Sequence, residues 1–374
     1  MCISKYHLVL LSILPFLISC KYESSDGVST NNSLVFDITF DNGDKTSPLS
    51  LSQIFDSVSY IPLKNDSGII IGGIKDIKFV HNRFYIWDNK ANALYVFDNK
   101  GNYLQEISHI GNASNEHILI GGFDVNPRNE EISLFDSPSR KIKRFSKKGT
   151  FLDNLSLKDV IRDFAVLGNG DYVFYTPDYL KGKNRRGAWQ TDSSGVFKKQ
   201  LVSMSDDFLY GGLYPTCFCR INDSTIGLKG GEDHDYIYHI TADTIVVKYQ
   251  LKVDIKIPDE IKKRAILNFE NYKGKVYTKN DYFETEKLMT IAVSNLKRRI
   301  LLFYHKTDSC HWLIQSEKDL VEDIKLHTWF QSSYNKALIG VLDCSYILSF
   351  PGLREEFPDI DESSNPILMV AYTK

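Results

Sequence analysis

The chain has 374 residues, of which 43% are hydrophobic and 25% are charged, with 45 Lys and Arg against 47 Asp and Glu. This composition excludes a disordered or collagen-like chain and supplies enough apolar surface for a large core. The net charge of -2 argues against a general polyanion binder, so we expect no nucleic-acid partner.

Residues 1–19 have the features of a signal peptide. Lys5 supplies a positive charge, and the apolar stretch Leu8–Ile18 is too short to span a hydrocarbon core of about 30 Å. The following Leu17-Ile18-Ser19-Cys20 resembles the lipobox of bacterial lipoproteins, in which the cysteine is lipidated and becomes the first residue. The sequence therefore predicts a membrane anchor at Cys20. The alternative is an ordinary secretory leader that happens to contain a cysteine.

Residues 20–33 form a polar segment that we interpret as the lipidated cysteine and a flexible tether. At about 3.5 Å per residue, the 13 residues after Cys20 span at most about 45 Å, which would keep the folded domain, residues 34–374, close to its membrane. Lys21 is not the Asp that retains lipoproteins in the inner membrane of enteric bacteria. We therefore expect an outer-membrane lipoprotein of the cell envelope. The periplasmic side and the cell-surface side of that membrane are both alternatives for its location.

An internal repeat organises the first half of the domain. Residues 72–104 align without a gap on residues 120–152, with seven identities in 33 positions and conserved hydrophobic class at others. The paired identities include Asp76 with Asp124. Each copy contains short strands, and the turn that ends at Gly101 is typical of a hairpin with glycine in the left-handed conformation.

Fainter copies follow from Asp163, from Cys217, from Lys275 and from Ala337. Six units of about four strands predict an all-β fold, a six-bladed β-propeller in which seven blades remain an alternative, because a radial arrangement protects sheet edges. Apolar residues at helical spacing predict one inserted helix over residues 258–272.

Four phrases of the sequence resemble the six-bladed, NHL-like β-propeller lipoproteins of gut-dwelling Gram-negative anaerobes. They are Leu51–Leu63, Tyr85–Asp88, Val96–Gly101 and Asn365–Val370. The loop Gly111–His117 departs from the family's glycine- and proline-containing phrase. The resemblance implies an exported, lipid-anchored propeller and no particular reaction.

In a propeller the first and last strands usually share a blade and close the ring. Candidates for this closure are Ile367–Tyr372 at the C-terminal end and either Val35–Phe40 or Val58–Leu63 near the start. An open ring would expose two sheet edges, so we expect the closure to matter for stability.

The sequence contains no phosphate-binding loop, nucleophile elbow, zinc-protease motif or EF-hand loop. Candidate ligands for a divalent metal are Asp233, His234 and Asp235, with His117 as a fourth contributor. A solvated turn at residues 232–235 and a polar loop around His117 are the alternatives.

Four cysteines remain in the folded domain: Cys217, Cys219, Cys310 and Cys344. Cys217 and Cys219 are two residues apart on an expected strand, so they cannot easily bond to each other. Buried free thiols are the favoured interpretation, and pairing across neighbouring blades is the alternative.

Positive charge is concentrated between Arg140 and Lys199, where 14 Lys and Arg residues accompany six Asp residues. A candidate site for an anionic ligand comprises Arg140, Lys141, Arg144, Lys181, Lys183, Arg185 and Arg186. Solvated outer strands and a loop explain the same charges.

These observations predict a non-catalytic, lipid-anchored binding module that recognises a partner protein or an envelope ligand through one loop face. The alternatives are a metal-assisted hydrolase or lyase with its site at the propeller channel, and a lipoprotein that binds glycans through exposed aromatic residues.

Overall fold

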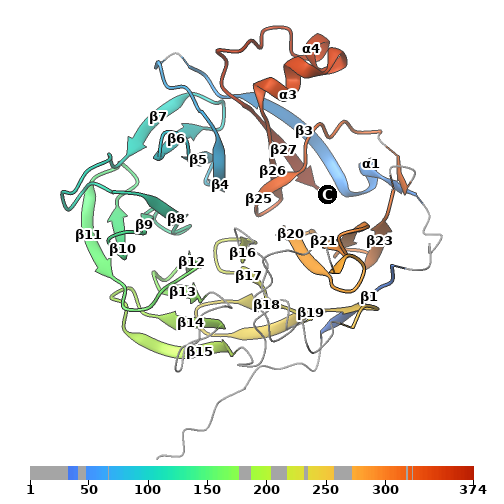
Figure 1. Cartoon of the computed structure of the whole chain (residues 1–374), viewed down its shortest axis with the longest axis horizontal. Helices are drawn as coiled ribbons and strands as arrows, with labels where there is room; N and C mark the ends of the chain where they lie inside the picture. The colour runs from blue at the N-terminus through green and yellow to red at the C-terminus, as the bar shows by residue number, and fades with distance from the viewer. Residues whose placement is uncertain are drawn as a thin grey trace, which may run out of the picture.

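Six mainly antiparallel sheets form the blades of a ring in the computed structural model (Figure 1). The structure describes residues 33–40, 48–65, 67–176, 187–203, 217–230, 235–256, 272–316, 319–321 and 323–374. The prediction of a six-bladed β-propeller is confirmed, and a seventh blade is excluded by the strand order. The expected helix over 258–272 lies outside the described residues, except for its last residue, Tyr272.

Blades 1 to 3 each contain four consecutive strands, numbered from the centre of the ring outward. Blade 1 comprises β4 (Ile74–Val80), β5 (Arg83–Asp88), β6 (Ala93–Asp98) and β7 (Tyr103–Ile107). Blade 2 comprises β8 (Ile120–Val125), β9 (Ile132–Asp136), β10 (Lys141–Phe145) and β11 (Phe151–Ser156). Blade 3 comprises β12 (Asp163–Val166), β13 (Tyr172–Tyr175), β14 (Gly187–Thr191) and β15 (Phe197–Ser203).

Blades 4 to 6 follow the same plan, with strands from the N-terminal region added to two of them. Blade 4 comprises β16 (Phe218–Arg220), β17 (Ile226–Lys229), β18 (Tyr236–Ile240), β19 (Ile245–Val253) and β1 (Leu34–Ile38). Blade 5 comprises β20 (Thr278–Glu284), β21 (Leu288–Ser294), β22 (Arg299–His305) and β23 (Cys310–Ile314). Blade 6 comprises β25 (Phe330–Tyr334), β26 (Ala337–Leu342), β27 (Ile367–Thr373) and β3 (Phe55–Pro62).

The smaller elements lie outside the six blade sheets. They are β2 (Leu49–Ser50), which pairs with β24 (Leu320–Val321), and the short helices α1 (Leu51–Ile54), α3 (Cys344–Ser349) and α4 (Pro351–Glu356). Within the described ranges, no helix combines the length and the apolar character needed to cross a membrane.

The repeated hairpin has the predicted geometry. Gly101, Gly149 and Gly195 all have positive φ angles, between 76° and 84°. At Gly101 a side chain would also collide with the backbone of Pro62, because the ideal Cβ position lies 2.0 Å from that residue's carbonyl oxygen. Glycine is therefore required there by both conformation and space.

Ring closure uses one of the two predicted N-terminal segments. The outer strand β3 pairs with β27 in an antiparallel register that runs from Pro62 opposite Ile367 to Phe55 opposite Thr373. The other candidate, Val35–Phe40, does not contribute to blade 6. Its strand β1 instead adds to blade 4 as a fifth strand, in parallel with β19.

Strand β1 also fastens blade 4 to blade 5. Phe36 is buried, and its ring lies 5.2 Å from the ring of Tyr304 in blade 5. The guanidinium of Arg298, in the turn between β21 and β22, donates a hydrogen bond of 2.8 Å to the carbonyl oxygen of Phe40. The N-terminal segment therefore holds two neighbouring blades together.

The two ends of the blades differ in the length of their connections. At one end, which we call the turn face, the first strand of each blade joins the second through two to six residues, and in blades 1 to 5 the third joins the fourth through four or five residues. The other end, the loop face, carries the remaining connections within and between successive blades, and seven of them have 11 or more residues. Two of these, between β19 and β20 and between β26 and β27, have 24 residues each.

Candidate functional site

Five charged side chains lie on the innermost strands of blades 1 to 4. This central charged cluster consists of Asp76 and Lys78 on β4, Asp124 on β8, Asp163 on β12 and Arg220 on β16. Lys78 Nζ lies 3.0 Å from Asp76 Oδ2, and Arg220 Nη2 lies 2.6 Å from Asp124 Oδ2. The second pair joins blade 4 to blade 2 and is almost completely buried.

Asp163 has no salt-bridge partner of its own in the described part of the chain. Its Oδ2 accepts hydrogen bonds from the backbone N–H groups of Cys217 at 2.6 Å and Phe218 at 3.3 Å. Burial raises the pKa of this carboxyl to about 6, although Lys78 and the backbone donors oppose the rise. A carboxyl group that titrates near neutral pH can exchange a proton under physiological conditions, which is typical of functional sites.

Lys78 remains a cation in this environment. Burial alone would lower the pKa of its ammonium group, but the nearby carboxylates of Asp76, Asp124 and Asp163 raise the pKa above its ordinary value. Its side chain is 21% exposed and that of Asp76 is 12% exposed, so both contact solvent. The cluster therefore combines a fixed cation with a carboxyl group that changes charge near pH 6.

Hydrogen bonds between hairpin turns cross the centre of the propeller at the turn face. The backbone N–H of Asn335 donates to the carbonyl oxygen of Ile221 at 2.7 Å, and that of Glu286 donates to the carbonyl oxygen of Asn335 at 2.7 Å. The Tyr334 hydroxyl donates to the Asp223 carboxylate. These contacts join the turns of blades 4, 5 and 6, so we expect solvent and small solutes to reach the central charged cluster from the loop face.

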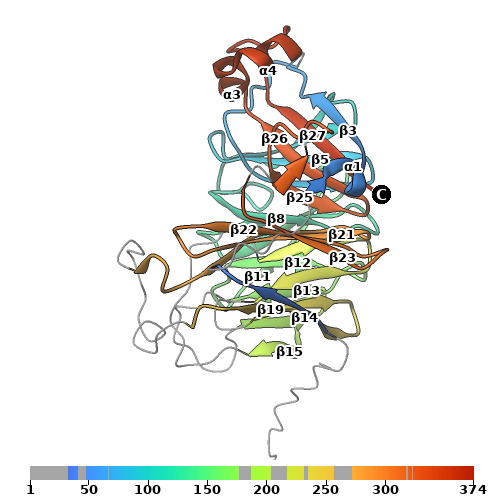
Figure 2. The same cartoon turned by 90° about the vertical axis from the view of Figure 1, so that its right-hand side faces the viewer.

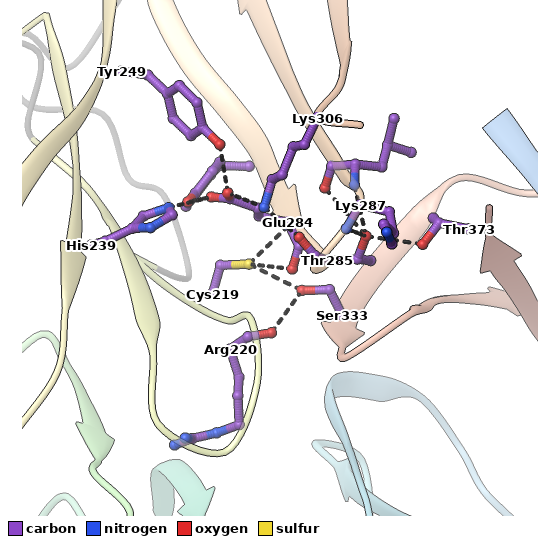
Figure 3. A network of polar contacts seen from close by, with 12 residues as sticks. Cys219, Arg220, His239, Tyr249, Glu284, Thr285, Lys287, Lys306, Ser333 and Thr373 are labelled. Carbon is purple, nitrogen blue, oxygen red and sulfur yellow. Dashed lines mark hydrogen bonds and ion pairs between the residues drawn. The ribbon is translucent and has the colours of Figure 1, made fainter. Parts of the chain in front are cut away.

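A second polar network surrounds Glu284, the last residue of β20 (Figure 3). Its carboxylate is fully buried and lies 2.5 Å from Lys306 Nζ and 2.9 Å from His239 Nε2. The Tyr249 hydroxyl donates a third hydrogen bond at 2.7 Å, and the Tyr282 hydroxyl donates a fourth. Burial alone would raise the pKa of Glu284, but His239 and Lys306 outweigh it and lower the pKa to about 2.

Cys219 connects this network to blade 6. Its sulfur accepts a hydrogen bond from the backbone N–H of Glu284 at 3.0 Å and lies 3.0 Å from the hydroxyl of Ser333 on β25 (Figure 3). Burial raises the pKa of the thiol to about 12. The thiol therefore stays protonated and is not an activated nucleophile, so the network is best described as the junction of blades 4, 5 and 6.

Of the four proposed metal ligands, the structure describes Asp235 and His117. Asp233 and His234 lie outside the described residues, and Asp235 accepts a hydrogen bond of 2.7 Å from the Tyr277 hydroxyl in blade 5's entry segment. His117 is fully buried between blades 1 and 2, with Nε2 2.7 Å from the carbonyl oxygen of Asn92 and Nδ1 3.0 Å from the Ser108 hydroxyl. In the described ranges, no three His, Cys, Asp or Glu side chains are arranged to hold a metal ion.

The proposed basic patch is only partly described. Lys181, Lys183, Arg185 and Arg186 lie outside the described residues. Arg144 binds the Asp153 carboxylate through two nitrogens at 2.5 Å and also the carbonyl oxygen of Ser193 at 2.9 Å. Its charge is thus compensated, whereas Arg140 and Lys141 lie at the loop-face end of blade 2.

The four cysteines of the folded domain are thiols and form no disulfide with one another. Cys217 and Cys219 are buried, as expected, whereas Cys310 is exposed and Cys344 is half-buried.

Exposed apolar side chains are unevenly distributed between the connections of the two faces. Eight large ones lie in loop-face connections: Ile70, Ile110, Ile118, Leu119, Val160, Val321, Tyr346 and Phe350. Four others, Leu104, Leu152, Val246 and Tyr372, lie on strands near their turn-face ends. Ile70 and Ile110 are more than 60% exposed. Among the described turn-face connections, Val196 is the sole residue of this kind. Figure 2 shows the blades from the side, so the two ends of the strands can be compared.

This apolar surface was not predicted from the sequence. One sequence feature could have indicated it: aliphatic residues in segments that lack the alternating pattern of a strand. Ile110 and Leu119, for example, lie on either side of a loop that contains glycine and asparagine. Apolar side chains that lie in loops and cannot enter the blade core are candidates for contact with a partner.

Comparison with solved structures supports the fold. The chain is similar to a protein of Bacteroides fragilis NCTC 9343 described as a presumed exported protein, with 17% identity, a TM-score of 0.73, and 92% of this chain and 100% of that chain covered. It is also similar to a DUF4221-family protein of Bacteroides vulgatus, with 9% identity, a TM-score of 0.50 and coverage of 86% and 97%. Among curated proteins, none matches the chain. The family model for the domain of unknown function DUF4934 matches residues 34–372, and the chain therefore belongs to the DUF4934 family.

Proposed function

We propose that this protein is a lipid-anchored cell-envelope module that binds a partner through its loop face, without catalysing a reaction. The exposed apolar side chains of the loop-face connections carry this proposal. Eight such residues lie in these connections, whereas the described turn-face connections contain Val196. Rigid blades that present variable loops are well suited to recognition because the loops tolerate change while the scaffold keeps its shape.

The chemistry of the surface indicates the kind of partner. Ile118 and Leu119 are adjacent, exposed and aliphatic, and the segment that contains them also exposes Ile110. On α3 and just after it, the exposed rings of Tyr346 and Phe350 lie 4.7 Å apart. Aliphatic and aromatic side chains together match the centre of a protein–protein interface, with a polar rim supplied by the surrounding loops. The aromatic pair also suits a sugar ring, so a glycan is the alternative ligand.

Location in the cell envelope rests on the N-terminal sequence. The signal-like residues 1–19 and the lipobox-like segment that ends at Cys20 support export and lipidation. The similarity to a presumed exported protein of Bacteroides fragilis agrees with this location. The outer membrane is favoured by Lys21.

The experiment is an analysis of complexes from the producing bacterium's envelope, solubilised in mild detergent and separated by native electrophoresis. We expect the wild-type protein to migrate in a complex, and the double variant Ile118→Ser, Leu119→Ser to migrate as the free protein. Val196→Ser, which removes an exposed apolar side chain from the turn face, is the matched control and should leave the complex intact. A complex that survives the double variant but is lost with the Val196 variant would contradict the proposal.

A second candidate function is an enzyme with its site at the centre of the ring. The observation in its favour is Asp163, whose pKa of about 6 and proximity to the Lys78 cation are typical of an acid–base group. In this case the loop-face double variant would retain activity, whereas Asp163→Asn would lose it. The metal-assisted form of this candidate rests on Asp233, His234 and Asp235, and a thermal shift with divalent metals that a chelator reverses would support it.

A further inference from the structure

The direction of β1 relates the N-terminal end of the folded domain to the two faces. Strand β19 begins at Ile245, next to a turn-face hairpin, and ends at Val253, next to a loop-face connection. Because β1 is parallel to β19, it also runs from the turn face toward the loop face. Its first residue, Leu34, therefore marks the end of β1 nearer the turn face, and Figure 1 shows β1 beside β19 at the edge of the ring.

The length of chain before Leu34 limits where an anchor at Cys20 can lie. Thirteen residues separate the two positions, so their maximum span is about 45 Å. Leu34 is paired with Tyr249. Tyr249 is four residues from Ile245, the turn-face end of β19, so Leu34 lies about 13 Å from that end along the strand. A chain that continues in the direction set by β1 therefore passes the turn face with about 30 Å to spare.

The opposite arrangement is harder to reach. To place the loop face against the membrane, the chain before Leu34 would have to reverse its direction and pass the loop-face end of β19. It would then have to extend beyond connections of up to 24 residues, whereas the turn-face connections have six residues at most. Because the turn-face connections are short, the ends of the blades on that side can lie close to the membrane surface.

The charge of the turn face does not by itself determine which face of the domain lies toward the membrane. The exposed turn-face residues include both cations, such as Lys100 and Lys148, and anions, such as Asp243 and Asp308. Mixed charges of this kind provide no strong attraction to an anionic bilayer. The orientation therefore depends on the geometry of the N-terminal connection and should persist at high ionic strength.

We propose that the anchored protein lies with its turn face toward its own membrane and presents its loop face away from it. The partner on this side of the domain is the lipid bilayer, held there by the lipid on Cys20. This inference rests on the lipid anchor of the proposed function, and it adds that the loop-face partner approaches from the side opposite the membrane.

The test uses the full-length lipidated protein in vesicles of phosphatidylethanolamine and phosphatidylglycerol that contain a headgroup-linked fluorescence quencher. A fluorophore is attached at one of two exposed positions that flank β19, through Asp243→Cys at the turn face or Lys256→Cys at the loop face. Both variants carry Cys310→Ser and Cys344→Ser, which remove the accessible native thiols. Because the two positions belong to the ends of one strand, their difference reports the orientation of the domain.

We expect at least threefold stronger quenching at position 243 than at position 256, in both 0.1 M and 0.5 M salt. A 30-residue Gly-Ser segment inserted after Ser29 should remove the difference, because the longer connection permits every orientation. Equal quenching with the native connection, or stronger quenching at position 256, would overturn the inference.

Flotation of the vesicles separates this failure from failure of the anchor. If the native protein does not float with the vesicles while Cys20→Ala behaves identically, the lipid anchor is wrong and the orientation falls with it. Binding by the loop face would still be judged independently by the native electrophoresis of the Ile118 and Leu119 variant.

Discussion

Tyr60 and Met369 are direct partners in blade 6, although they are 309 positions apart in the sequence. Their pairing joins β3 to β27 and closes the ring without a covalent bond. Since every other blade is completed by consecutive strands, with β1 as an addition to blade 4, this junction is where the two ends of the repeat array meet.

Removal of residues 367–374 should abolish cooperative folding. The deletion removes β27, so β26 loses its outer neighbour, β3 loses its one partner within the described ranges, and two sheet edges become exposed. We expect residues 33–366 to show no sharp thermal transition by circular dichroism, whereas residues 33–374 melt cooperatively. An unchanged melting curve after the deletion would show that the ring does not depend on this closure.

Phe36→Ala should destabilise the protein by about 3 kcal/mol. Phe36 is 5% exposed and its ring contacts aromatic rings of blades 4 and 5, so its truncation leaves a cavity at their junction. The neighbouring Val35 is 45% exposed, and Val35→Ala should cost less than about 1 kcal/mol. Chemical denaturation measures both changes, and equal costs for the two variants would argue against the role of β1 in joining these blades.

Glu284→Gln should cost about 3 kcal/mol at pH 7, because it leaves the Lys306 ammonium group and the His239 ring without their buried carboxylate. The folded-state pKa of about 2 lies below the ordinary glutamate value of 4.5, so this stabilisation is present above pH 4.5 and is lost as the pH falls toward 2. The two proteins should therefore converge in stability at low pH.

Asp281→Asn is the matched control on the same strand. Asp281 forms an exposed ion pair with Arg299, and pairs of this kind contribute between zero and about 1 kcal/mol. A loss for the Asp281 variant as large as that for the Glu284 variant would show that the network at Glu284 has no special importance.

Asp163→Asn should change the pH dependence of stability in the opposite direction. The pKa of Asp163 is raised from 3.8 to about 6 in the folded state, so ionisation of this group opposes folding. Its cost is absent below pH 3.8, grows as the pH rises toward 6 and is complete above pH 6, where it reaches about 3 kcal/mol.

The asparagine variant does not ionise and should gain about 2 kcal/mol relative to the wild type between pH 4 and pH 7. Denaturant unfolding at several pH values measures this difference. A difference in the free energy of unfolding between the two proteins that does not vary with pH would mean that Asp163 titrates normally and is no acid–base candidate.

The sequence was sufficient for the blade count because hairpin signals such as Asp98–Gly101 recur with the hydrophobic face of each strand. The sequence was less reliable for deciding which residues on the inner strands of two blades are structurally equivalent. The ungapped repeat aligns Asp76 with Asp124, but the strand pairing makes Asp124 equivalent to Lys78. The reason is the first hairpin of blade 2, which has two more residues between Val125 and Ile132 than blade 1 has between Phe79 and Phe84.

The candidate sites could not be predicted in the same way. Arg220 and Asp124 are 96 residues apart, and Glu284 gathers its partners from β18, β19, β20 and the turn after β22. Such groupings depend on how the blades are arranged around the centre, which no local pattern records. The loop-face apolar residues were missed because an exposed Ile and a buried Ile look alike in a sequence without strand periodicity.

The most direct test of recognition by the loop face is site-specific photo-crosslinking in the living producing bacterium. A photoreactive amino acid is placed at Leu119 or Phe350 on the loop face, and at Lys100 or Val196 on the turn face, all exposed positions. The account predicts a discrete crosslinked adduct with one envelope component from the two loop-face positions and none from the two turn-face positions. An adduct with that component from Lys100 or Val196, and none from Leu119 or Phe350, would contradict it.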